Sequence, residues 1–119
     1  MPLNEMNTEK LHSTVKTVTD LLAQEAYIDL EKLSNGVRLT ANELKKAVVE
    51  YGCKIVPTPV QGYEELDVIE VIGSKPKQWS VNVPVFTLEE GKSDLTLELT
   101  IIESPSDLYR IEVDDLHVL

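Results

Sequence analysis

Residues 94–101 read Asp-Leu-Thr-Leu-Glu-Leu-Thr-Ile, a strict alternation of polar and apolar side chains. Because successive side chains of a β-strand point to opposite faces of a sheet, this period of two predicts a strand with one buried face and one solvated face. The preceding residues 89–92, Glu-Glu-Gly-Lys, are predicted to form the turn of a hairpin. Its other strand covers residues 79–85, where Pro84 cannot donate to a ladder and therefore predicts an edge position or a bulge.

Further strands are expected on both sides of this hairpin. Residues 109–114 alternate in the same way and predict the last strand of the chain. Residues 66–72 predict a strand that ends before Gly73, and residues 53–56 predict a short strand that stops at Pro57. Strands that follow one another with short connections pair mainly antiparallel.

Upstream of these strands the apolar residues recur with a period of about 3.6, which is typical of amphipathic helices. Helices are predicted over residues 8–25, 28–33 and 40–51. The third begins with the spacing of a capping box, in which Thr40 accepts from the third helical amide and Glu43 reaches back to the cap.

The order of the elements indicates the fold class. Helices followed by antiparallel strands predict one α+β domain over residues 1–119, with N-terminal helices packed on one face of a curved, mainly antiparallel sheet. We expect residues 1–7 to be a frayed terminus.

The charge of the chain is strongly acidic and unevenly distributed. The formal net charge is −10, and residues 57–119 carry most of it. A surface of this sign repels phosphate backbones, so we expect no nucleic-acid binding, whereas it attracts a basic protein. No apolar run approaches the length of a membrane span, and we expect no membrane association.

Motifs of catalysis and metal binding are weak. The N-terminus lacks the features of a secretory signal, and the single cysteine, Cys53, fits a reducing, cytoplasmic location. Residues 91–93 (Gly-Lys-Ser) lack the earlier glycine of a phosphate-binding loop. Asp115 and His117 share a face of the last strand, but the sequence offers no third ligand, so we expect no metal and no cofactor.

The chain resembles an uncharacterised group of small bacterial proteins. The resemblance runs from Leu39 to the end, through Tyr51-Gly52-Cys53, Trp79-Ser80-Val81, residues 90–95 and residues 114–118. It implies no activity. The order of elements also resembles the NTF2-like and cystatin-like cone folds, which host enzymes, binding domains and scaffolds.

Two functional hypotheses follow. The first is a non-catalytic module, of the immunity or inhibitor type, whose acidic sheet binds a basic protein. Its candidate residues are Glu89, Glu90, Asp94, Glu98, Glu112 and Asp114. The alternative is an NTF2-like pocket protein that binds or isomerises a small molecule. Its candidates are Tyr51, Tyr63, Asp67 and Trp79. The sequence leaves open whether the chain forms a homodimer.

Overall fold

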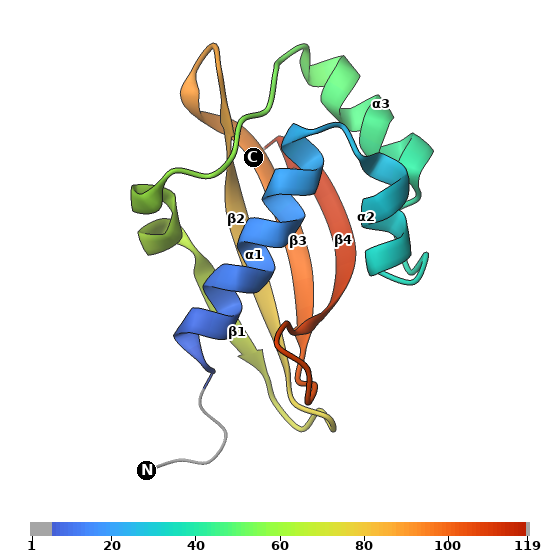
Figure 1. Cartoon of the computed structure of the whole chain (residues 1–119), viewed down its shortest axis with the longest axis vertical. Coiled ribbons are helices and arrows are strands. Elements are labelled where there is room, and N and C mark those ends of the chain that lie inside the picture. The colour runs from blue at the N-terminus through green and yellow to red at the C-terminus, as the bar shows by residue number, and fades with distance from the viewer. Residues whose placement is uncertain (1–5, 119) are drawn as a thin grey trace.

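The structure of the protein, a computed structural model, describes residues 6–118. Three α-helices and a short 3₁₀ helix precede four β-strands (Figure 1). In chain order they are α1 (Thr8–Ala23), α2 (Tyr27–Leu33), α3 (Ala41–Tyr51), η1 (Val60–Glu65), β1 (Asp67–Val71), β2 (Gln78–Thr87), β3 (Gly91–Ile102) and β4 (Arg110–Val118).

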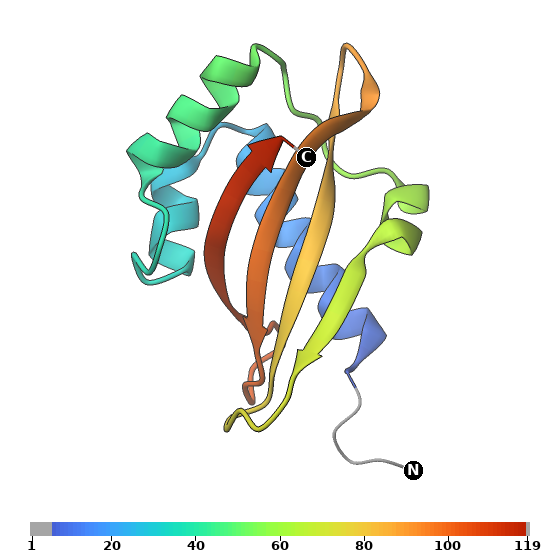
Figure 2. The ribbon, with the colours of Figure 1, turned by 180° about the vertical axis from the view of Figure 1, so that it is seen from behind.

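The strands form one antiparallel sheet in the order β1-β2-β3-β4. The helices lie over one face of this sheet (Figure 1), and the view from behind shows the other face without a covering helix (Figure 2). The predicted α+β fold, with N-terminal helices packed on an antiparallel sheet, is therefore confirmed. We call the two sides the covered face and the open face.

Helix α1 begins at Thr8, directly after its N-cap residue, Asn7. The Asn7 side chain accepts a hydrogen bond from the Lys10 amide at 3.0 Å, and the Asn7 amide donates to the Tyr109 hydroxyl at 2.9 Å. The prediction of a frayed terminus is therefore wrong at Asn7, because the end of the sheet fixes it. Residues 1–5, which belong to the same prediction, lie outside the described part of the chain.

Helix α3 has the predicted start. Thr40 Oγ1 accepts from the Glu43 amide at 3.2 Å, while the Glu43 carboxylate accepts from the Thr40 amide at 2.9 Å. The bond from the Thr40 amide, together with the nearby Thr40 hydroxyl, holds the pKa of the Glu43 carboxyl below its ordinary value of 4.5. Gly52 ends the helix in the left-handed region, with φ of 75°.

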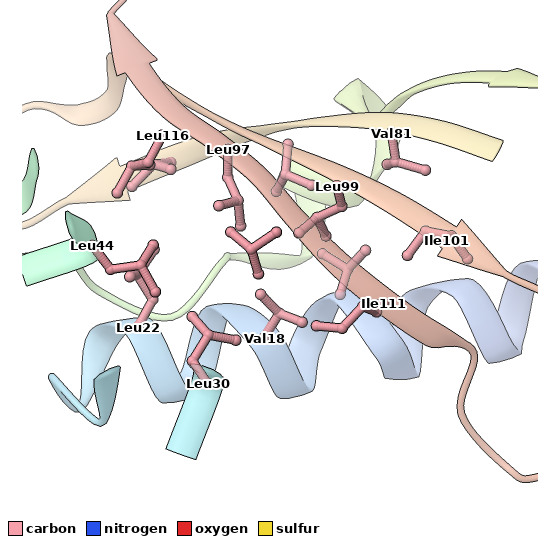
Figure 3. Packing of buried hydrophobic residues seen from close by; sticks show 14 of the residues in the cluster. Val18, Leu22, Leu30, Leu44, Val81, Leu97, Leu99, Ile101, Ile111 and Leu116 are labelled. Carbon is pink, nitrogen blue, oxygen red and sulfur yellow. The ribbon is translucent and has the colours of Figure 1, made fainter. Parts of the chain in front are cut away.

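The core lies between the helices and the covered face (Figure 3). Alternate residues of β3, among them Leu97, Leu99 and Ile101, are fully buried there. They meet the apolar stripe of α1, of which Val18 and Leu22 are also buried. Burying a side chain of this size contributes about 1.5–3 kcal/mol, so this face supplies most of the apolar stabilisation.

The predicted strand over residues 53–56 is absent, and this part of the prediction is wrong. Ile55 forms only an isolated antiparallel bridge with Thr87. The Val56 amide still donates to the Phe86 carbonyl at 2.9 Å, but the next residue, Pro57, has no amide to donate, so the ladder does not extend.

Two β-bulges interrupt the sheet. One lies next to Pro84, as the proline predicts: Pro84 pairs with Thr96 and Phe86 pairs with Lys92, so the extra residues are on β3. The other lies in β4, because Val113 pairs with Leu99 whereas Asp115 pairs with Glu98, which leaves one extra residue between them. The alternation of β4 alone does not indicate the second bulge.

Candidate functional site

Charged and polar side chains on the open face lie in rows that cross the strands. Residues directly opposite one another in an antiparallel pair point to the same face of the sheet. Asp67, Asn82, Glu98 and Asp115 are opposite one another across all four strands. We call these four residues the acidic row. The row brings together carboxylates from segments that are far apart in the sequence.

The next row consists of Ile69, Ser80, Thr100 and Glu112. Thr100 Oγ1 donates a 2.6 Å hydrogen bond to Asp114, the extra residue of the β4 bulge. This bond ties the bulge to β3 and orients one of the predicted partner-binding carboxylates.

Arg38 lies beside the β4 end of this second row. Its Nε atom is 3.3 Å from Asp114 Oδ1 and 3.9 Å from Glu112 Oε1. The loop that carries Arg38 is held against β4 by a parallel bridge to Val113. Arg38 therefore compensates two carboxylates of the open face.

His117 lies between two members of the acidic row. Its Nδ1 atom is 3.3 Å from Glu98 Oε2 and 3.2 Å from Asp115 Oδ2. The argument that Asp115 and His117 lack a third ligand is therefore wrong, since β3 supplies Glu98. Sequence reasoning missed the trio because the β4 bulge determines which residue of β4 faces Glu98.

A hollow of about 370 Å³ opens next to the β1 end of the acidic row. Lys92, at its rim, forms an ion pair of 2.7 Å with Glu65. The side-chain oxygen of Asn82 is buried in this region and has no hydrogen-bond partner among the described residues. The lining residues are Glu65, Asp67, Asn82, Pro84, Lys92, Ser93, Asp94 and Thr96.

The predicted residues of the β2–β3 turn have a different environment. The Tyr51 hydroxyl donates to Glu90 at 2.7 Å, which raises the pKa of Tyr51, and the Lys54 amide donates to Glu89 at 3.1 Å. These bonds fasten the turn to the end of α3. Of the six predicted partner-binding residues, Glu89 and Glu90 thus stabilise the fold at the turn, and the other four lie on the open face or at its hollow.

The four pocket candidates do not meet. Trp79 is buried in the core, where its ring lies 5.5 Å from that of Tyr109. Tyr63 packs its ring 5.0 Å from His12 of α1, and burial raises its pKa. Asp67 is on the opposite side of the sheet. Of five hollows on the surface of residues 6–118, none is lined by more than one of these candidates.

Cys53 is half-buried at the wall of a hollow of about 310 Å³ near the start of α2. Burial raises the pKa of its thiol, and the nearby Glu89 and Glu90 carboxylates act in the same direction. A nucleophilic cysteine requires the opposite shift. The environment of Cys53 is that of a small apolar residue.

The comparisons with known proteins give one match. A family model described as a domain of unknown function (DUF7668) matches residues 19–119. No curated protein and no solved structure matches the chain.

The length and apolar character of the helices can be set against what a membrane span requires. Among residues 6–118, none has the length and apolar character needed to cross a membrane.

Proposed function

The chain belongs to the DUF7668 family, and we propose that it is a non-catalytic module that binds a basic protein through the open face of its sheet. The observation that carries this proposal is the acidic row. Glu98 and Asp115 lie directly opposite each other, and like charges in that position are destabilising. A basic partner would turn this unfavourable arrangement into a favourable one.

The balance of charge on the open face supports the same function. Arg38 and Lys92 each already pair with carboxylates of this side of the molecule. The acidic side chains of the open face and its hollow are Glu65, Asp67, Asp94, Glu98, Glu112, Asp114 and Asp115. Such a surface attracts a basic protein and raises the rate of association.

The β1 end of the open face offers apolar contacts. Ile69 and Val71 have the same orientation as the acidic row, and their exposed fractions are 59% and 40%. Among the described residues no strand pairs with the outer edge of β1. A binding surface that combines exposed apolar anchors with charged neighbours is typical of protein interfaces.

An acidic α+β domain that neutralises a basic partner fits the immunity or inhibitor class. A long helix packed across consecutive antiparallel strands supports a cystatin-like or NTF2-like arrangement (Figure 1). The alternative function, a small-molecule pocket inside a cone, has less support because Tyr51, Tyr63, Asp67 and Trp79 are dispersed.

The test begins with a partner recovered from the native host by pull-down. Its association rate is then measured at several salt concentrations with the wild type and with the double variant Asp94→Lys, Glu112→Lys. We expect the association rate to fall with salt and the double variant to associate roughly 10-fold more slowly at low salt. The variant leaves Glu98, Asp115 and His117 unchanged.

The matched control is the double variant Glu25→Lys, Glu50→Lys, which makes the same change of charge at exposed residues on the helical side. It should retain more of the wild-type association rate than the open-face variant. Thermal unfolding of both variants checks that each is folded. Equal association of the open-face variant and the wild type at low salt would refute the proposal and favour the pocket hypothesis.

A further inference from the structure

Glu98, Asp115 and His117 bring three metal-ligating side chains to one point of the open face. Glu98 comes from β3, and Asp115 and His117 come from the facing part of β4. One potential ligand atom from each residue lies within 4.8 Å of those of the other two. We propose that these three residues bind a divalent transition-metal ion of the Zn²⁺ type. This inference does not depend on the proposed function.

The surroundings of the His117 imidazole also support a metal site. His117 Nδ1 is buried and has no hydrogen-bond partner among residues 6–118, although two carboxylate oxygens lie 3.2 and 3.3 Å away. Neither of these contacts is a hydrogen bond, although both oxygens are close enough to share an ion with the ring nitrogen. Buried nitrogens of this kind are usually satisfied.

The distances fit shared coordination. Two ligand bonds of about 2.0–2.1 Å that meet at a tetrahedral angle separate their donor atoms by roughly 3.3 Å. The separations of Nδ1 from Glu98 Oε2 and Asp115 Oδ2 are 3.3 and 3.2 Å. Both separations match the value expected for atoms that share one ion, and the two carboxylate oxygens lie within 4.8 Å of each other.

The set of donors selects the class of metal. One imidazole nitrogen and two carboxylate oxygens suit Zn²⁺ and its neighbours in the first transition row, whereas Ca²⁺ and Mg²⁺ prefer oxygen alone. The side chains are 32%, 37% and 53% exposed for His117, Glu98 and Asp115, so water can complete the coordination. The ion would also relieve the repulsion between the two carboxylates.

The experiment uses the full chain, stripped of metal with a chelator and titrated with Zn²⁺ by calorimetry at pH 7.5. We expect one Zn²⁺ per chain and a rise in the thermal unfolding midpoint in excess Zn²⁺. His117→Ala should weaken binding by at least ~10-fold, as should Glu98→Gln and Asp115→Asn. Because metal ions displace protons from their ligands, binding should weaken as the pH falls.

The matched control is His12→Ala, because His12 is the other histidine of the chain and lies on α1. It should bind Zn²⁺ as the wild type does. Nitrogen NMR of the wild type should show a Zn²⁺-dependent change at His117 Nδ1. Absence of stoichiometric Zn²⁺ binding would overturn the proposal, and so would equal affinities of the wild type and His117→Ala. The partner-binding proposal would stand after either result.

Discussion

Neighbouring residues of β3 have opposite surroundings on the two faces of the sheet. Leu97 and Leu99 are fully buried under the helices, whereas Glu98 between them lies on the open face beside Asp115 and His117. The covered face is apolar and filled, and the open face is polar with an excess of carboxylates. The two faces of the same strand therefore have different roles. One supplies the stabilisation of the fold, and the other is free to carry charges that do not stabilise it.

The strongest test of this division truncates a side chain on the covered face. Leu99→Ala removes a fully buried side chain, and such changes cost about 2–5 kcal/mol because the core only partly closes the cavity. Urea denaturation measures the free energy of unfolding. The paired variant Glu98→Ala, one residue away on the open face, should change it by no more than about 0.5 kcal/mol. Equal losses of unfolding free energy in the two variants would show that the two faces contribute equally to stability.

A smaller effect is expected where the open face does contribute to stability. Thr100→Val removes the hydroxyl that donates to Asp114 at 2.6 Å. A hydrogen bond to a charged acceptor contributes about 1.5–3 kcal/mol, and partial exposure should place the measured loss at the lower end. Ser80→Ala, opposite Thr100 on β2, is the control, since Ser80 has no side-chain hydrogen bond recorded within residues 6–118. Similar results for both variants would mean that the bulge does not need this bond.

The smallest effect concerns the helical layer. Thr40→Ala removes the cap of α3 and should lower the free energy of unfolding by about 1 kcal/mol. Thr40→Ser, which keeps an acceptor oxygen, should recover most of the loss in the same urea assay. If Thr40→Ala unfolds with the wild-type midpoint, the capping box does not stabilise the covered side.

Much of the architecture could be predicted because it depends on residues close together in the chain. The capping box at Thr40 and the bulge at Pro84 each follow from a local pattern, and both are present. The predicted strand at 53–56 failed because the bridge between Ile55 and Thr87 is not continued, since Pro57 has no amide to donate. The prediction at Asn7 failed because Tyr109, which lies 102 residues further along the chain, accepts a hydrogen bond from the Asn7 amide.

The sequence by itself determined the order of the three α-helices and the four β-strands, the inward parity of the strands up to the β4 bulge, and the acidic character of the C-terminal half. These properties depend on periods of 2 and 3.6 residues and on composition, which need no distant contact. Only the tertiary structure decided which carboxylates face one another. The β4 bulge at Asp114 shifts the register, so that Asp115 rather than Asp114 lies opposite Glu98, with His117 beside both. Register depends on pairing between separate strands, and a single extra residue changes every neighbour beyond it.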